Sequence, residues 1–368
     1  MPLDSYRTLG RSGLVVSPLA LGTMTFGVAR WGIDRPEAEA VFDAYVGAGG
    51  NLVDTADVYA GGRGEEMLSA IIADRGLRDR LVLATKSGFA TGSGPHAGGN
   101  GAKRIYAAVE GSLRRLQTDH IDLYWAHVWD SVTPPEELLE TMAALVRAGK
   151  IRYWGISNTP AWYVAKLATL AAVRGMPGPI AMQHFYSLVS RDIEQEHVPL
   201  ARDSGLGVVP WSPLAYGLLT GKYDRAQVEA SGPRAGGLPS DAGTGQPRPE
   251  GDRRLDGPNP FGDTLFTDRN WRIVDALKVM AAEIGEPPAR VALAWVLSRP
   301  GVDTALIGVS RVSQLHDNIG ATDLHLSAEQ LATLDAATAL EPSLYGLFSP
   351  PGRQNVVFGG SPVASRLD

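Results

Sequence analysis

The chain has 368 residues, of which 44% are hydrophobic, so it can bury a sizeable core. It contains no cysteine, which excludes disulfides, a thiolate metal site and a cysteine nucleophile. The formal net charge of −6 argues against a nucleic-acid or anionic-membrane partner. The sequence shows neither a secretory signal nor a run near the roughly 20 apolar residues of a membrane span. We therefore expect a soluble, cytoplasmic protein.

Short apolar runs alternate along the chain with longer segments of helical periodicity. The runs are too short for helices, and several are apolar at nearly every position, which is typical of strands buried on both faces. We predict strands at 19–24, 51–57, 81–86, 121–127, 151–157, 181–186, 207–212 and 304–309. We predict helices at 35–48, 65–75, 103–116, 135–148, 160–173, 193–204, 268–284 and 310–319.

This alternation favours an α/β fold, a parallel sheet closed into a (β/α)₈ TIM barrel, over an open doubly wound sheet. The dinucleotide fingerprint G-x-G-x-x-G is absent, which weakens a Rossmann interpretation. We expect one domain over residues 1–368. A Gly/Pro-rich loop (224–260) interrupts the seventh unit, and a C-terminal tail (341–368) lacks periodicity. Both are predicted to cover the catalytic mouth, and the alternative for each is a disordered surface segment.

Three neighbouring predicted strands end in side chains with acid–base chemistry. Asp54 and Tyr59 lie at the end of the second strand and in the loop after it, Lys86 ends the third, and His127 ends the fourth. Taken singly, each has a structural interpretation as a turn residue, a solvated lysine or a packing side chain. Because barrel enzymes place their chemistry at the carboxyl ends of strands, we expect the four residues to converge at one mouth.

Together these four residues have the chemistry of a proton donor for a carbonyl oxygen. An ammonium group near a phenol favours the phenolate, so Lys86 is predicted to lower the pKa of Tyr59. Asp54 is predicted to keep Lys86 protonated and in place. His127 is predicted to hydrogen-bond the substrate oxygen or relay a proton. The histidines lack metal-ligand spacing, so we expect no catalytic metal.

Several segments, in order and at characteristic spacing, carry a resemblance to a known family. They are Leu21-Gly22-Thr23-Met24, 51–59 (NLVDTADVY), 81–86, 121–127 (IDLYWAH) and 150–158 (KIRYWGISN). With them the chain resembles the aldo-keto reductases over nearly its whole length. Segments 211–223 and 308–318 are similar to the bacterial sugar and xenobiotic reductases and to the potassium-channel beta subunits. Ile307-Gly308 departs from the Pro-Gly of many members.

The resemblance implies a catalytic tetrad of Asp54, Tyr59, Lys86 and His127, with Tyr59 as general acid. It also implies that NADPH (NADP⁺) binds in an extended form, with Trp211 stacked on the nicotinamide and with Asn158 and Gln183 on its carboxamide. The cofactor-binding residues implied in this way are Gly22, Thr23, Met24, Asp54, Ser157, Asn158, Gln183, Trp211, Ser212, Pro213, Leu214, Ala215, Gly217, Leu218, Lys222, Gly308, Ser310, Arg311, Gln314 and Asn318.

The eighth unit also has the features of a phosphate site. Gly308 allows close backbone approach, and Ser310 is predicted at a helix N-terminus, which favours anions. Arg311 can grip a phosphate with two donors, and Lys222 can add a second charge. The alternative is a serine cap followed by an exposed arginine.

The leading hypothesis is an NADPH-dependent carbonyl reductase acting on a small carbonyl substrate. A regulatory module that uses bound NADPH as a redox signal, and an alcohol dehydrogenase running oxidatively, remain alternatives. Aromatic residues near the strand ends predict a partly apolar substrate such as a cyclic ketone or xenobiotic, with sugars possible, although each could be core. The predicted substrate pocket consists of Phe26, Trp31, Tyr59, His127, Trp129 and Tyr216. The sequence does not determine the oligomeric state.

Overall fold

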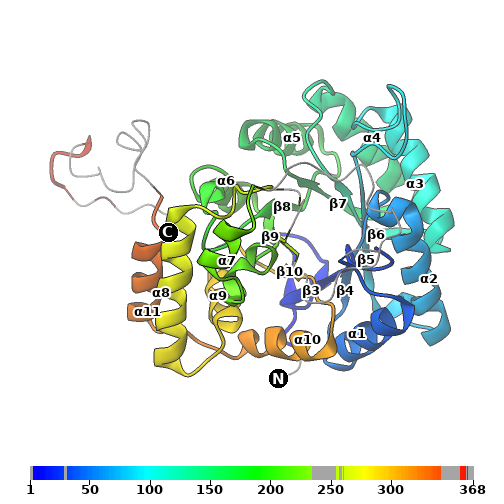
Figure 1. Ribbon diagram of the computed structural model, residues 1–368. Helices are drawn as coiled ribbons and strands as arrows, with labels where there is room; N and C mark the ends of the chain where they lie inside the picture. The colour runs from blue at the N-terminus through cyan, green and yellow to red at the C-terminus, as the bar shows by residue number, and fades with distance from the viewer. Residues whose placement is uncertain are drawn as a thin grey trace.

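The computed structural model describes residues 3–28, 31–233, 254–256, 259, 261–340, 357–361 and 363. Within them, eight parallel strands form a barrel that helices surround (Figure 1). The strands are β3 (Leu19–Gly22), β4 (Leu52–Asp54), β5 (Val82–Ser87), β6 (Ile121–Ala126), β7 (Ile151–Ser157), β8 (Ala181–Phe185), β9 (Gly207–Trp211) and β10 (Ala305–Ile307).

The strands follow one another around the barrel in chain order, and β10 returns to pair with β3. Every pairing along this order is parallel. The two remaining edges meet through a parallel bridge between Val208 and Val302, and the amide of Asp303 donates to the carbonyl of Val208 at 3.2 Å. The predicted (β/α)₈ barrel is therefore confirmed.

The outer helices include the eight predicted positions and two further helices, Pro288–Leu297 and Ala328–Ala337, that the sequence analysis does not predict. They are α1 (Arg35–Gly47), α2 (Arg63–Arg75), α3 (Ala102–Leu116), α4 (Pro135–Arg147), α5 (Ala161–Arg174), α6 (His197–Ser204), α8 (Asp268–Ile284), α9 (Pro288–Leu297), α10 (Val312–Ile319) and α11 (Ala328–Ala337). Short 3₁₀ helices are η1 (Tyr59–Gly62), η2 (Arg78–Arg80), η3 (Asp192–Glu194), η4 (Ala215–Thr220) and η5 (Gly320–Thr322).

Several bounds differ from the sequence prediction. The helix predicted from 193 begins at His197, because η3 occupies the preceding residues. The helix predicted from 310 begins at Val312, with Arg311 as its N-cap. The predicted loop at 224–260 contains a short helix, α7 (Arg225–Ala230), in which the Asp224 side chain accepts a hydrogen bond from Gln227 N. Residues 234–253 of that loop, and most of the predicted tail at 341–368, lie outside the described residues.

An N-terminal hairpin of β1 (Arg7–Thr8) and β2 (Val15–Val16) closes one end of the barrel. Its Leu9, Leu14 and Val16 pack with a cluster of inward-facing strand residues that includes Leu52 and Trp125. The amide of Gly10 donates to Asp303 Oδ2 at 2.7 Å, just before β10 begins. Because the hairpin seals the amino ends of the strands, a ligand has access only at their carboxyl ends.

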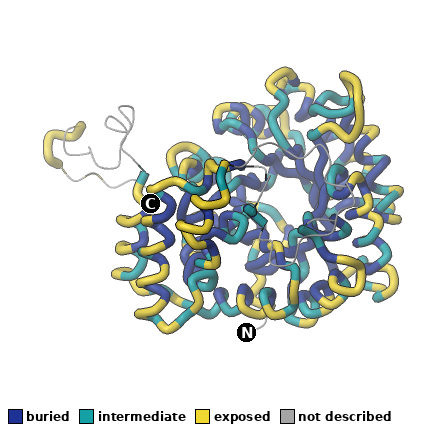
Figure 2. The backbone as a smooth tube through the Cα atoms, in the orientation of Figure 1, coloured by how far each residue is buried: buried dark blue, intermediate teal, exposed yellow. Residues whose placement is uncertain are grey.

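A second and larger apolar cluster lies between the strands and the helices, so each strand is buried on both faces. Figure 2 shows this burial at the centre of the molecule and exposed residues on the outer helices. Among the described residues, no helix is long and apolar enough to cross a membrane.

Candidate functional site

The two-residue period of the strands places the predicted site residues in one layer of the barrel. Leu52, Ala84, Trp125 and Ala181 belong to the apolar cluster inside the barrel. Since side chains alternate between faces, the positions two residues further along also point inward. Those positions hold Asp54 at the end of β4, Lys86 near the end of β5, His127 just after β6 and Gln183 in the middle of β8.

Asp54 and Lys86 form a buried ion pair across neighbouring strands, with side chains 4% and 1% exposed. Lys86 Nζ also donates to the carbonyl oxygen of Thr55 at 2.9 Å. Gln183 Nε2, from the far side of the barrel, donates to Asp54 Oδ2 at 3.2 Å. The hydroxyl of Thr23 donates to the Asp54 carbonyl at 3.1 Å. The predicted contact between Asp54 and Lys86 is therefore present.

Burial acts against both charges of this pair. It raises the pKa of Asp54 and lowers the pKa of Lys86, and the attraction between them opposes each shift. The additional hydrogen bonds from Gln183 and to Thr55 favour the charged form of each partner. We therefore treat the pair as a carboxylate and an ammonium.

Tyr59 begins η1, in the loop that follows β4. Lys86 Nζ lies 5.2 Å from the centroid of its ring, and the His127 ring meets it edge-on with centroids 6.0 Å apart. The sequence predicts that Lys86 lowers the pKa of Tyr59. This prediction is wrong, because the net shift of the pKa is upward. Burial raises the pKa of Tyr59 well above its usual value, and the charge of Asp54 raises it further. The Lys86 ammonium is paired with Asp54, and the opposite charge of Asp54 acts on the phenol as well.

His127 is 8% exposed. Burial lowers the pKa of His127 well below its usual value, and the charge of Lys86 adds to the effect. Among the described residues its Nδ1 has no hydrogen-bond partner. Phe89 meets the His127 ring edge-on, with centroids 4.7 Å apart. The sequence analysis did not select Phe89, although its position three residues after Lys86 places it in the loop that follows the same strand.

Asn158 links the end of β7 to its neighbours on both sides. Its backbone is left-handed, with φ 49°. Nδ2 donates to the carbonyl of His127 and to Ser157 Oγ, both at 2.9 Å, and Oδ1 accepts from Trp211 Nε1 at 3.1 Å. Trp211 also packs against Phe185, with ring centroids 4.9 Å apart. The predicted carboxamide-binding residues Asn158 and Gln183 thus already have protein partners.

The loop after β9 has an unusual backbone. Ser212, Ala215, Tyr216 and Gly217 all have positive φ, which is costly for residues other than glycine. Pro213 and Leu214 lie between them in sequence, and Leu218 and Ala215 are fully buried. Gly217 has φ 91°, a conformation that favours glycine, and a Cβ atom there would lie 2.8 Å from Lys222 Nζ.

The β10–α10 turn holds the predicted phosphate residues. A side chain at Gly308 would meet no atom within 4 Å, so open space adjoins this backbone. Ser310 is not the helix cap: its amide and its hydroxyl pair with Gln314 Oε1 at 3.0 and 3.2 Å. Arg311, the N-cap residue, is exposed, and Asn318 is 5% exposed in the last turn.

The predicted pocket aromatics separate into two groups. Phe26 has no exposed surface and packs in the main core, so it does not line an open pocket here. Trp31, Trp129 and Tyr216 are partly exposed. Arg254, which sequence reasoning missed, places its guanidinium 4.3 Å from the ring centroid of Trp31 and 4.4 Å from that of Tyr216.

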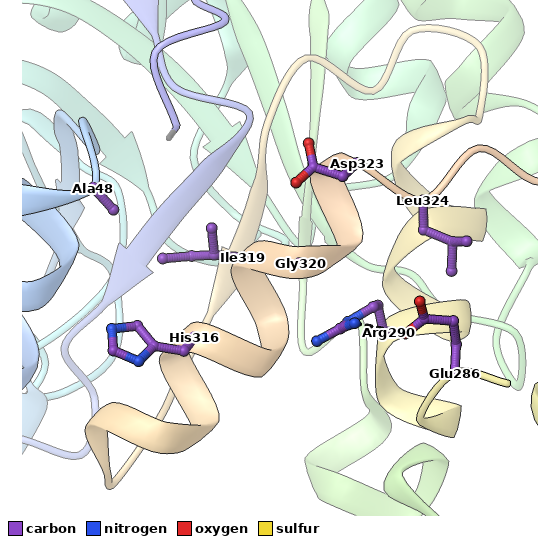
Figure 3. Close-up of a pocket in the computed structure, with 8 residues that line it drawn as sticks. All are labelled: Ala48, Glu286, Arg290, His316, Ile319, Gly320, Asp323 and Leu324. Atoms are coloured by element: carbon purple, nitrogen blue, oxygen red, sulfur yellow. Dashed lines mark hydrogen bonds and ion pairs between the residues drawn. The ribbon is translucent and has the colours of Figure 1, made fainter. Parts of the chain in front are cut away.

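A hollow of about 510 Å³ lies away from these residues, between α10 and the turn that joins α8 to α9 (Figure 3). Its charges are already paired: Arg290 donates to Glu286 at 2.6 Å and to the carbonyl of Asp317 at 3.3 Å. None of the predicted site residues lines it. We therefore place the candidate site at the carboxyl end of the barrel and not in this hollow.

Comparison with known proteins agrees with the geometry. A model of the aldo/keto reductase family matches residues 18–339. An uncharacterized oxidoreductase of Bacillus subtilis is 38% identical over 340 residues, which cover 90% of this chain and 94% of that protein. A probable voltage-gated potassium channel subunit beta of Oryza sativa is 35% identical, covering 92% and 97%. An aryl-alcohol dehydrogenase [NADP(+)] of Phanerodontia chrysosporium is 30% identical, covering 94% and 89%. The chain belongs to the aldo/keto reductase family and is an oxidoreductase.

Proposed function

We propose that the protein reduces an aldehyde or ketone to an alcohol with NADPH, by direct hydride transfer and with Tyr59 as general acid. The observation that carries this proposal is the buried Asp54–Lys86 pair, which lies beside Tyr59 and His127 at the open end of the barrel. Carbonyl reduction is also the activity that the family in general supports.

Tyr59 donates its proton to the carbonyl oxygen as negative charge develops there. A phenol is protonated at neutral pH even at its ordinary pKa near 10, so the proton is available. His127, held neutral by its lowered pKa, hydrogen-bonds the same oxygen and fixes its position. Its ring already contacts Tyr59, so both groups can reach one atom.

Lys86 and Asp54 support this proton transfer. The ammonium 5.2 Å from the Tyr59 ring stabilises the phenolate that remains after the proton leaves. Asp54 holds the ammonium in place, and Gln183 holds Asp54. The pair is a fixed local dipole formed by two buried side chains, so little reorganisation accompanies the reaction.

The residues at the mouth suit an extended dinucleotide. NADPH, when bound, supplies the hydride. The open space beside Gly308 allows close approach to the backbone, and Arg311 with Lys222 offers charge for a 2′-phosphate. Trp211 offers a partly exposed ring, and Asn158 and Gln183 would orient a carboxamide. The NADP⁺ in the name of the P. chrysosporium relative supports this choice of cofactor.

A substrate panel tests the proposal. NADPH oxidation is followed by absorbance with aldehydes, cyclic ketones and keto-sugars, and NADH serves as the matched cofactor. We expect multiple turnovers with at least one carbonyl class and a preference for NADPH. A single stoichiometric turnover that stalls on cofactor release would instead indicate a redox-sensing module, and binding without any oxidation would contradict reduction.

A further inference from the structure

The turn that carries Tyr59 is anchored through Asp57. The amide of Tyr59 donates to the carbonyl of Ala56 at 3.1 Å, so Asp57 lies inside this turn. The amide of Asp57 donates to the carbonyl of Lys86 at 3.0 Å, which joins the turn to β5. The Asp57 side chain is 2% exposed, so its carboxyl group needs a partner within the protein.

Arg104, in the first turn of α3, supplies that partner. Its Nη2 donates to Asp57 Oδ2 at 2.6 Å, and the Arg104 side chain is 10% exposed. The same Nη2 donates to the hydroxyl of Thr91 at 3.3 Å. Thr91 belongs to the loop that joins β5 to α3 (88–101). Arg104 therefore connects the Tyr59 turn to the 88–101 loop.

Both of these segments contact the His127 ring. Tyr59 meets it edge-on with centroids 6.0 Å apart, and Phe89, from the 88–101 loop, does so at 4.7 Å. The two rings thus reach His127 from segments that Arg104 joins. Because Tyr59 and His127 are both proposed to bond one carbonyl oxygen, a small change in their relative position would slow proton transfer.

The backbone directly after Tyr59 is under strain. Ala60 has φ 50° and ψ 29°, in the left-handed region that is costly for a residue with a side chain. The next two residues, both glycine, also have positive φ. Such a backbone persists only where the surrounding contacts hold it. The pair of Asp57 and Arg104 provides one such contact, on the amino-terminal side of the strained residues.

The Asp57–Arg104 pair is poorly suited to a purely stabilising role. The neighbouring Glu65 uses both carboxylate oxygens, accepting from Thr85 Oγ1 at 2.6 Å and from Arg115 Nε at 2.7 Å. In the part of the chain that the structure describes, Asp57 Oδ1 and Arg104 Nε have no hydrogen-bond partner. Burial raises the pKa of Asp57 to about 6, although Arg104 acts to lower it. A buried pair with unfilled hydrogen bonds contributes little net stability, so positioning the turn explains its place better.

We propose that Arg104 is a positioning residue that fixes the Tyr59 turn against the 88–101 loop. It does so through Asp57 and Thr91, and the phenol is thereby held where it can reach the same carbonyl oxygen as His127. The proposal rests on the proposed reduction with Tyr59 as proton donor. Loss of Arg104 should therefore slow proton transfer and leave cofactor binding intact.

Arg104→Gln tests this proposal, because it keeps a polar side chain and removes the charge. With a carbonyl that the wild type reduces, we expect kcat to fall about tenfold to hundredfold, as for a small misplacement of a catalytic group. NADPH affinity, measured by fluorescence titration, should be unchanged. Arg104→Lys should recover part of kcat, because an ammonium can still pair with Asp57. A variant Arg104→Gln with the wild-type kcat, or with weakened NADPH binding, would overturn the proposal.

A double-variant cycle with Tyr59→Phe separates positioning from a general loss of structure. If Arg104 acts through the phenol, Arg104→Gln should cause little further loss of kcat once the hydroxyl is absent. A loss by the same factor in both backgrounds would overturn the proposal in favour of a structural role. If Arg104→Gln does not fold, Arg104→Lys takes its place in the cycle. A Tyr59→Phe single variant with nearly the wild-type kcat would instead refute the proposed proton donor.

Arg78→Gln is the matched control. Arg78 pairs with Asp122 at 2.8 Å, and it lies just before β5, at the opposite end of the barrel from the site. Its loss should lower the free energy of unfolding and leave kcat unchanged. A fall in kcat as large as that of Arg104→Gln would show that loss of any such ion pair slows the enzyme, and would contradict a positioning role for Arg104.

Discussion

Asp54 and Lys86 depend on each other because the barrel interior offers little else to compensate either charge. Both side chains are almost fully buried, and desolvation shifts both pKa values toward the neutral forms. Such a pair contributes little net stability compared with apolar residues, but removing one partner leaves a buried charge uncompensated. The pair is therefore better explained by the chemistry proposed for Tyr59 than by a contribution to folding.

Lys86→Met should lower both stability and activity. We expect the free energy of unfolding in urea to fall by about 3–5 kcal/mol, because Asp54 loses its counter-ion. The double variant Asp54→Asn/Lys86→Met should recover most of that stability while remaining inactive. A Lys86→Met protein as stable as the wild type would show that the pair is not buried in solution.

At the residue scale, the sequence was sufficient to locate residues whose place in the fold follows from their position at the end of a strand. Asp54, Lys86 and His127 were selected because they lie at the ends of predicted strands, where barrel enzymes carry their chemistry. The direction of the Tyr59 pKa was wrong, because the sequence does not show how deeply the phenol is buried, and burial is the largest cause of its raised pKa. Arg254 carried no signal at all, since its aperiodic loop gives no spatial neighbours.

The strands and helices could be predicted where their burial produces a recognisable pattern of apolar residues in the sequence. The barrel strands are buried on both faces and appear in the sequence as apolar runs. Helix α9 was missed because Val291–Val296 is buried at every position, which removes the helical period. The hairpin β1–β2 was missed because two-residue strands are too short to show alternation.

Helix α10 provides the test of cofactor choice. Arg311 caps its N-terminus, where the helix dipole also favours an anion. Arg311→Ala should weaken NADPH binding about tenfold to hundredfold with little effect on NADH, because only NADPH carries the 2′-phosphate. Adding Lys222→Ala should erase the remaining preference. Fluorescence titration of both cofactors measures the difference.

The matched control for this test is Arg290→Ala. Arg290 contacts the far end of α10 through the carbonyl of Asp317 and lies in the hollow of Figure 3. It should leave the ratio of NADPH to NADH affinity unchanged. Equal losses for the two cofactors in Arg311→Ala, or a wild type that prefers NADH, would contradict the 2′-phosphate assignment.

At the scale of the whole molecule, the closed end of the barrel determines where chemistry can occur. The hairpin residues Leu9, Leu14 and Val16 fill the amino end, and apolar side chains fill the interior above them. The next inward layer is polar and contains the proposed proton donor and its supporting pair. Because the strands share the same two-residue period, their polar inward-facing residues lie in one layer that faces the open mouth.

The most direct test of this account is the turnover of Tyr59→Phe, which removes one hydroxyl and leaves the ring. With a carbonyl that the wild type reduces, we predict that kcat falls about 100-fold or more, as for loss of a general acid. NADPH affinity should be unchanged, and Tyr106→Phe, at an exposed position on α3, should behave as the wild type. A Tyr59→Phe protein that keeps more than about a tenth of the wild-type kcat would contradict a tyrosine acid.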